Sequence, residues 1–171
     1  MKDLTRRWAR PAVMSREVDM EKPAWWSSDE WATPPVFVER WAKELGLDAF
    51  TLDACCRPET AKAEHYFTKT HDSLLQLWFG AVCLNPPYSK IRPWLQKARA
   101  SVAVPSACSL VCALLPAAVD TSWFHEEVLM ADAEIRFVRG RLRFLGWEGT
   151  PIPAPKTPSL IVIYRAKSQG R

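Results

Sequence analysis

The chain has 171 residues, of which 48% are hydrophobic and 25% are charged. These are the values of an ordinary soluble globular protein with one domain and a substantial core. The formal net charge of +4 permits a polyanionic partner without requiring one. No run approaches the roughly 20 apolar residues that span a bilayer, and no apolar segment follows Lys2, Arg6 and Arg7 as in a secretion signal. The sequence therefore excludes a membrane-spanning protein and predicts a cytosolic one.

The cysteines indicate a reduced core rather than a disulfide framework or a metal site. They are odd in number and mostly lie inside apolar runs, as buried thiols do: Cys55, Cys56, Cys83, Cys108 and Cys112. A zinc site would need paired C-x-x-C spacing, which is absent. His65 and His71 are the only alternative ligands near Cys55 and Cys56, and we discard this alternative and expect no metal.

Residues 1–24 are polar, charged and aperiodic, and are predicted to form a loosely ordered arm. Its arginines could touch a phosphate backbone, although a solvated tail is the simpler interpretation. Residues 25–171 are predicted to form a single domain. The first helix is expected after Thr33 as N-cap, with Pro34 at its first position and Gly46 at its end. Phe37, Trp41 and Leu45 recur at four-residue spacing and should share one face.

The following segments alternate between strands and helices. Strands are expected at 50–54, 81–85 and 108–116, with a helix at 91–102 and a second helix, capped by Asp120, that carries Trp123, Phe124 and Leu129. Three further strands are expected at 133–138, 141–145 and 159–165. Alternation followed by clustered strands predicts an α/β sheet that is mostly parallel, with an antiparallel strand near the C-terminal edge.

Asn85, Pro86, Pro87 and Tyr88 follow the predicted buried strand at 81–85 directly. In open α/β sheets, ligands bind beyond the carboxyl ends of the strands. The side-chain oxygen of Asn85 and the carbonyl of Pro86 are two acceptors held by a rigid Pro-Pro unit. They can receive an amino group that offers two hydrogens, while Tyr88 offers a flat face to a planar ring. A simple turn is the alternative interpretation, because Asn and Pro are common turn residues.

The amine that fits this arrangement is planar and conjugated, such as N6 of adenine. Its lone pair is spread into the ring, so it is a poor nucleophile. Hydrogen bonds from both protons to the two acceptors favour a pyramidal nitrogen with a localised lone pair. Such catalysis is electrostatic and positional, and it needs neither a metal nor a covalent intermediate.

From about residue 27 to 165, the chain resembles the phage-type, Dam-like DNA N6-adenine methyltransferases. The shared pieces occur in order: DEWATPP, FTLDACC, ETAKAEHYFT, HDSLLQLWFGAVCLNPPYS, LLPAAVDTSWFH, AEIRFVRGRLRF and TPSLIVIY. The resemblance implies a Rossmann-like methyltransferase fold and S-adenosylmethionine as the methyl donor. It also implies that Asn85, Pro86, Pro87 and Tyr88 are the catalytic motif. A phage or prophage gene product working in the cytoplasm of a bacterial host is the expectation that accompanies it.

The resemblance also assigns donor-binding residues. Thr33 and Pro34 match a Thr-Pro element that holds the methionine end of the donor, although Thr33 could simply cap the helix. Asp53 would take the ammonium group of the donor, unless it only caps the next turn, and Asp72 would approach its adenine. LDACCRPE stands where a glycine-rich loop is expected, and Glu59 and Glu64 are the only candidates for the ribose.

DNA contacts are expected from a basic segment and from loops. A paired adenine cannot reach such a pocket, so it must be flipped out or taken from a single strand. Arg139, Arg141 and Arg143 alternate and would share one face of a strand for phosphate contacts, or else form an ordinary solvated face. Phe144 is a candidate base contact. With no separate target-recognition domain expected, base-specific contacts would come from residues 57–71 and 145–157; the family suggests GATC as a common target.

Two alternatives stay open at this point. The first is another amino-group methyltransferase on the same fold, acting on an RNA base, on N4 of cytosine or on a protein glutamine. The second is a nucleic-acid-binding module without catalytic activity, which the missing glycine-rich loop favours and the intact Asn-Pro-Pro-Tyr tetrad opposes.

Overall fold

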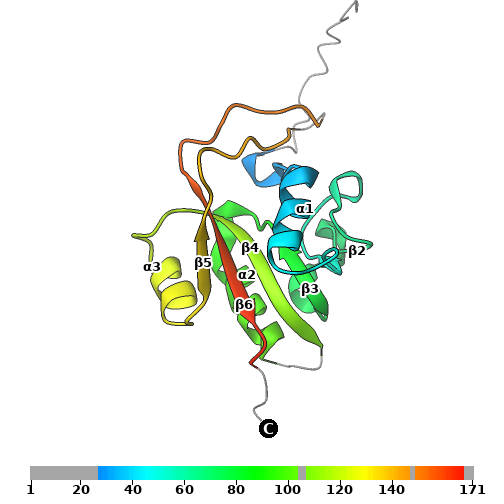
Figure 1. The fold of residues 1–171 in the computed structure, drawn as a ribbon, viewed down its shortest axis with the longest axis vertical. Helices are drawn as coiled ribbons and strands as arrows, with labels where there is room; N and C mark the ends of the chain where they lie inside the picture. Colours follow the sequence, from blue (N-terminus) through cyan, green and yellow to red (C-terminus); the bar gives the residue numbers. More distant parts are fainter. Residues whose placement is uncertain (1–26, 104–106, 147–148, 168–171) are drawn as a thin grey trace, which may run out of the picture.

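Six strands form one sheet in the order β2-β1-β3-β4-β6-β5 (Figure 1). The strands are β1 (Leu52–Asp53), β2 (His65–Tyr66), β3 (Gly80–Leu84), β4 (Cys108–Pro116), β5 (Glu134–Phe137) and β6 (Ser159–Arg165). In this computed structural model, β6 runs antiparallel to both of its neighbours, and the other strands run parallel to one another. The predicted sheet, mostly parallel with an antiparallel strand near the C-terminal edge, is confirmed. The structure describes residues 27–103, 107–146 and 149–167, so the predicted arm at 1–24 lies outside them.

Helices cover both faces of this sheet, which gives three layers (Figure 1). The long helices are α1 (Pro35–Glu44) and α2 (Ile91–Val102), and a short α3 (Ser122–Phe124) continues as the π-helical turn η6 (His125–Leu129). Single 3₁₀ turns link the remaining elements: η1 (Ser28–Glu30), η2 (Pro58–Thr60), η3 (Lys69–His71), η4 (Ser73–Leu75) and η5 (Tyr88–Lys90). Within the described ranges, no helix has both the length and the hydrophobicity that crossing a membrane requires.

The strands are apolar on both sides because both faces are buried. Alternate residues of β3 point to opposite faces, so Val82 and Leu84 belong to the core beneath α2, whereas Ala81 and Cys83 belong to the core beneath α1. The predicted helical face of Phe37, Trp41 and Leu45 packs against this second core. The helical layers on both faces thus support the carboxyl ends of β1 and β3, which lie at the same end of the sheet.

The start of α1 differs from the expectation. Pro34 occupies the N-cap position and no side chain caps the helix, so Thr33 is not its cap. Proline restricts the residue before it to extended backbone, which holds Thr33 outside the helix. The end of α1 is as predicted, because Gly46 adopts a φ of +74° just beyond Leu45, the C-cap.

Three other expectations differ from the structure. Thr121, not Asp120, occupies the N-cap position of α3, and the helix then widens into the π-helical turn. Residues 141–145 are not a strand: Leu145 makes isolated bridges to Ala32 and Pro151, away from the sheet. Gly140, with a φ of +80°, turns the chain away from the sheet after β5. The strand expected at 50–54 is reduced to the two residues of β1.

Gly80 at the start of β3 supplies a test of this packing. Its φ is +63°, and a Cβ atom there would lie 2.5 Å from Oγ1 of Thr51. We expect Gly80→Ala to lower the free energy of unfolding by about 3 kcal/mol, because it adds backbone strain and a clash. Gly46→Ala is the matched control, since its φ is +74° and nothing lies within 4 Å; it should cost about 1 kcal/mol. Urea unfolding measures both variants. An equal loss of unfolding free energy in the two would contradict a clash between a Cβ at residue 80 and Thr51.

Candidate active site

One cavity of about 830 Å³ opens at the carboxyl ends of β1 and β3. Its walls come from residues 27–33, which we name the N-terminal strap, from the segments after β1 and β2, and from the beginning of the tetrad. Cavities of this size bury most of a small-molecule ligand or cofactor. The predicted residues Thr33, Asp53, Asp72, Asn85 and Pro87 all line it, although they come from distant parts of the chain.

Asn85 presents a buried hydrogen-bond acceptor to the cavity. Its Nδ2 donates a hydrogen bond to the main-chain carbonyl oxygen of Trp31 at 2.9 Å. A carbonyl oxygen can only accept, so this contact fixes the orientation of the amide. The opposite atom, Oδ1, is buried and has no hydrogen-bond partner among the described residues. Buried polar atoms are nearly always paired, so this oxygen indicates a ligand that donates a hydrogen bond.

Tyr88 is held edge-on between the two cores. Its ring centroid lies 6.5 Å from that of Phe144, with an interplanar angle of 83°. Its hydroxyl donates to the carbonyl oxygen of Leu114 at 3.5 Å, which is long for such a bond. Burial raises the pKa of the Tyr88 phenol, which therefore stays protonated. Of the tetrad, Asn85 and Pro87 line the cavity, while Pro86 is buried beneath them.

The N-terminal strap contacts the chain directly after the tetrad. Asp29 accepts hydrogen bonds from the main-chain N–H of Ser89 at 3.2 Å and from its hydroxyl at 2.6 Å. Ala32 pairs with Leu145 through two main-chain hydrogen bonds, of 3.0 Å and 2.8 Å. Sequence reasoning missed the positioning roles of Asp29 and of the Trp31 carbonyl. The only sequence signal for these roles was the DEWATPP piece shared with the family, of which only Thr33 and Pro34 were assigned a function.

Asp53 both caps the turn after β1 and lines the cavity. Its Oδ1 accepts from the N–H of Cys55 at 3.3 Å, and its Oδ2 accepts from the N–H of Lys62 at 3.0 Å. Burial is the largest influence on this carboxyl group and raises its pKa above the ordinary value. Asp72, with a left-handed φ of 47°, is exposed and also lines the cavity. Thr33 is buried at the strap, and Pro34 is not among the described residues that line the cavity.

Three thiols line the cavity without being nucleophiles. Burial, with help from the charge of Asp53, raises the pKa of Cys55 to about 12. The pKa values of Cys56 and Cys83 are raised as well, again chiefly by burial. The thiolate is the reactive form of cysteine. These groups therefore remain neutral thiols and contribute packing rather than covalent chemistry.

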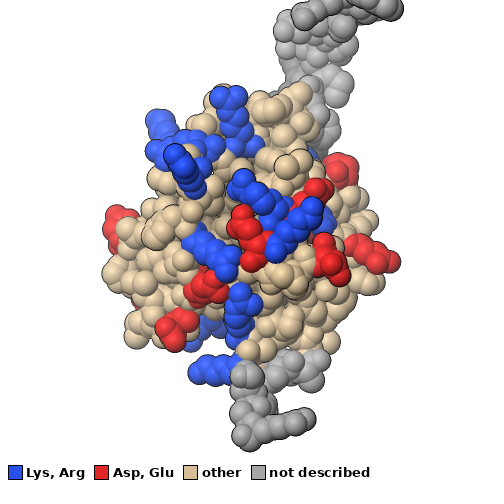
Figure 2. Space-filling view, in the orientation of Figure 1, with Lys and Arg blue, Asp and Glu red and all other residues tan. Residues whose placement is uncertain are grey.

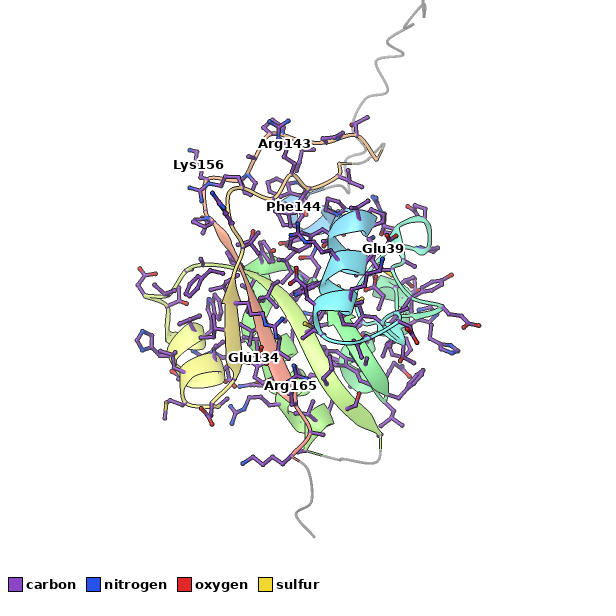
Figure 3. All side chains as sticks on the ribbon, viewed as in Figure 1. Glu39, Glu134, Arg143, Phe144, Lys156 and Arg165 are labelled. Atoms are coloured by element: carbon purple, nitrogen blue, oxygen red, sulfur yellow. The ribbon has the colours of Figure 1, made fainter. Side chains whose placement is uncertain are left out.

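Exposed cations gather on residues 138–146 and 149–158, which we together name the basic loop. Figure 2 shows them at the upper left of this face, where Figure 3 places Arg143 and Lys156. Arg139 and Arg141 are also exposed. Arg139, Arg141 and Arg143 do not share one face of a strand, because this segment is not a strand. The arginines still project from one loop beside the strap.

Phe144 differs from the other members of the basic loop. Only 1% of its surface is exposed, and Figure 3 shows it below Arg143, toward the body of the protein. Its ring lies 5.9 Å from that of Trp31 and contacts Tyr88 edge-on. Phe144 thus packs against the strap and the tetrad, and its role as a base contact stays a prediction.

The fold and the site together define an α/β protein whose cavity at the strand ends is lined by Asn85, with its Oδ1 lacking a hydrogen-bond partner among the described residues. The model of the DNA N-6-adenine-methyltransferase (Dam) family matches residues 23–171, and the chain belongs to this family. It is therefore a methyltransferase, and its family implies S-adenosylmethionine as methyl donor.

No curated protein matches the chain. Among solved structures, a similar chain is a Pyrococcus horikoshii protein assigned as an RNA methyltransferase. It is 13% identical, the match covers 80% of this chain and 83% of that one, and the TM-score is 0.49.

Proposed function

We propose that this methyltransferase transfers a methyl group from S-adenosylmethionine to N6 of an adenine flipped out of DNA. The observation that carries the proposal is the buried Oδ1 of Asn85, which has no hydrogen-bond partner in the part of the chain that the structure describes. Asn85 lines a cavity large enough for a nucleoside-containing donor. An exocyclic amine can donate the hydrogen bond that this acceptor lacks among the described residues. The family match favours DNA adenine over other amines.

Asn85 and Pro86 would act on the amine before and during transfer. Oδ1 of Asn85 and the carbonyl of Pro86 accept its two protons, which favours a pyramidal nitrogen whose lone pair is directed into the cavity. The Trp31 carbonyl keeps the amide from rotating, so the acceptor is already in place when the base arrives. Tyr88 would steady the base with its ring, and Phe144 holds that ring from the side.

The residues present fit the donor. Asp53 and Asp72 place carboxylates on two walls of the cavity for the ammonium and the adenine of the donor, and Thr33 lies beside the tetrad. Pro34, together with Thr33, would shape the methionine end. When bound, the donor supplies an electrophilic methyl group. Glu59 and Glu64 are absent from the described lining of this cavity, so they are not proposed as ribose ligands.

The basic loop would hold the DNA backbone. Arg139, Arg141, Arg143 and Lys156 are exposed on it, and it is joined to the strap at Ala32–Leu145, so phosphates bound there lie near the cavity mouth. With residues 25–171 as a single domain, base-specific contacts fall to residues 57–71 and 145–157, and GATC is the proposed target. We place this activity in the cytoplasm of a bacterial host cell, on a phage or prophage gene product.

Arginine substitutions test the DNA surface. Arg141→Ala and Arg143→Ala should each weaken binding to duplex DNA, and each should reduce the slope of log affinity against log salt by about 1, since one phosphate contact is lost. Lys43→Ala, an exposed cation on α1, is the control and should leave both quantities unchanged. Fluorescence anisotropy over a salt series measures them. Unchanged slopes in the arginine variants would remove the basic loop from the DNA interface.

The proposed function is tested by expressing the protein in a host that lacks adenine methylation and mapping modified bases by single-molecule sequencing. N6-methyladenine at one short motif, absent with the Asn85→Ala variant, would support reaction, substrate and target together. Parallel assays with labelled donor on duplex DNA, RNA and protein complete the experiment. Label found only in RNA or protein would refute the proposal, and folded protein that binds no donor would favour a non-catalytic nucleic-acid-binding module.

A further inference from the structure

Arg57 forms an ion pair with Glu59 and still has guanidinium nitrogens without a hydrogen-bond acceptor among the described residues. It lies in the segment after β1 and lines the same cavity as Asp53. Its side chain is only 15% exposed, and its Nε and Nη1 are buried without a hydrogen-bond acceptor among the described residues. Glu59 lies 3.1 Å from Nε, but its own side chain is 61% exposed. A guanidinium remains charged at any physiological pH and offers five N–H donors. One exposed carboxylate does not satisfy these donors, so this site favours a further anionic ligand.

The backbone of Arg57 is fixed before any ligand arrives. Oγ1 of Thr60 accepts a hydrogen bond from the Arg57 N–H at 3.1 Å and donates one to the Arg57 carbonyl at 3.2 Å. Pro58 rigidifies the same turn, η2. The guanidinium is therefore presented by a short, closed loop. A preorganised cation loses little conformational entropy when it binds.

Asp53 supplies the opposite charge in the same cavity. Each of its carboxylate oxygens accepts one main-chain N–H and keeps further acceptor capacity for a ligand ammonium group. An amino acid carries an ammonium and a carboxylate on one carbon atom. A cavity that offers Asp53 and, four residues later, Arg57 thus has the charges to bind such a zwitterion.

The N-terminus of α1 is a poor alternative site for the carboxylate. Pro34 and Pro35 have no N–H groups, and the N–H groups of Phe37 and Val38 both donate to the Pro34 carbonyl, at 3.1 Å and 3.3 Å. The Thr-Pro element therefore has few free donors to offer an anion. Since this chain also has no glycine-rich loop after β1, a side chain is needed in its place.

We propose that Arg57 binds the carboxylate of the donor's amino-acid end, and that Arg57 and Asp53 together select a donor that carries a complete amino acid. This inference rests on the proposed use of S-adenosylmethionine. It assigns a binding residue to the segment where the family pattern is missing.

Calorimetry with two ligands isolates the carboxylate contact. S-adenosylhomocysteine carries the amino acid, whereas 5′-methylthioadenosine has the same nucleoside and thioether sulfur without it. We expect Arg57→Ala to weaken binding of S-adenosylhomocysteine roughly 10- to 100-fold, the range for a hydrogen-bonded charge, and to leave binding of 5′-methylthioadenosine unchanged. Arg57→Lys should restore part of the loss. Arg40→Ala, on the outer side of α1, is the control.

The outcomes are separable. Equal weakening of both ligands by Arg57→Ala, or no weakening of either, would overturn the role of Arg57, since only the amino-acid end should respond. If Arg57→Ala does not fold, Arg57→Gln, which keeps the shape and most of the packing, replaces it in the same two titrations. Failure of the wild-type protein to bind either ligand would overturn the proposed function, and this inference with it.

Discussion

Asn85→Ala is expected to lower methyl transfer roughly 10²- to 10³-fold, the effect of removing one preorganised hydrogen-bonding group from a reaction centre. Oδ1 of Asn85 is the buried acceptor that would bind the amine, and alanine has no replacement for it. Donor affinity should stay within about twofold, because the loss concerns an interaction made with the amine. Single-turnover rates and donor titrations measure the two quantities.

The control for this variant removes an amide far from the cavity. Gln96→Ala deletes a side chain on α2 whose Nε2 donates to Glu127 at 3.0 Å, so it should leave turnover unchanged. Asn85→Ala also deletes the bond to the Trp31 carbonyl, which should cost about 1 kcal/mol of stability. Near-normal turnover by folded Asn85→Ala protein would refute the assigned role.

Tyr88→Ala should damage both stability and catalysis, whereas Tyr88→Phe should be mild. The ring packs against both cores, so its deletion should lower the free energy of unfolding by about 2–4 kcal/mol and remove the support for the target base. The hydroxyl lies 3.5 Å from the Leu114 carbonyl, and a bond of that length contributes little. Urea unfolding and turnover at saturating DNA separate the two effects.

Tyr66→Ala is the matched control, because that tyrosine is 37% exposed on the edge strand β2 and should tolerate truncation. Similar losses in Tyr88→Phe and Tyr88→Ala would show that the hydroxyl, rather than the ring, is the important group. A loss of stability without any loss of turnover in the folded fraction would restrict Tyr88 to packing.

Long segments with one strong pattern were predictable from the sequence. The bounds of α2 at Ile91–Val102 and of β4 at Cys108–Pro116 agree with expectation, because an amphipathic run and an apolar run ended by proline each allow one local structure. The position of Asn85 at a strand end followed from the same reasoning. These elements depend mainly on their own residues.

The errors arose where distant contacts decide the structure. Leu142 and Phe144 alternate with arginines like a strand, but they are buried against the α1 core while Leu145 pairs with the strap. The groups that position the tetrad were also hidden: a main-chain carbonyl, such as that of Trp31, has no sequence signature. Trp31 lies 54 residues from Asn85 along the chain. Only the folded arrangement brings such groups together.

The place of β6 in the sheet has a consequence for biosynthesis. Residues 159–165 lie between β4 and β5, and β5 has no other partner in the described sheet. A nascent chain that ends before residue 159 leaves the long, apolar β4 with an open edge and leaves β5 unpaired, and such edges favour aggregation. The sheet can therefore close only after residues 159–165 have left the ribosome.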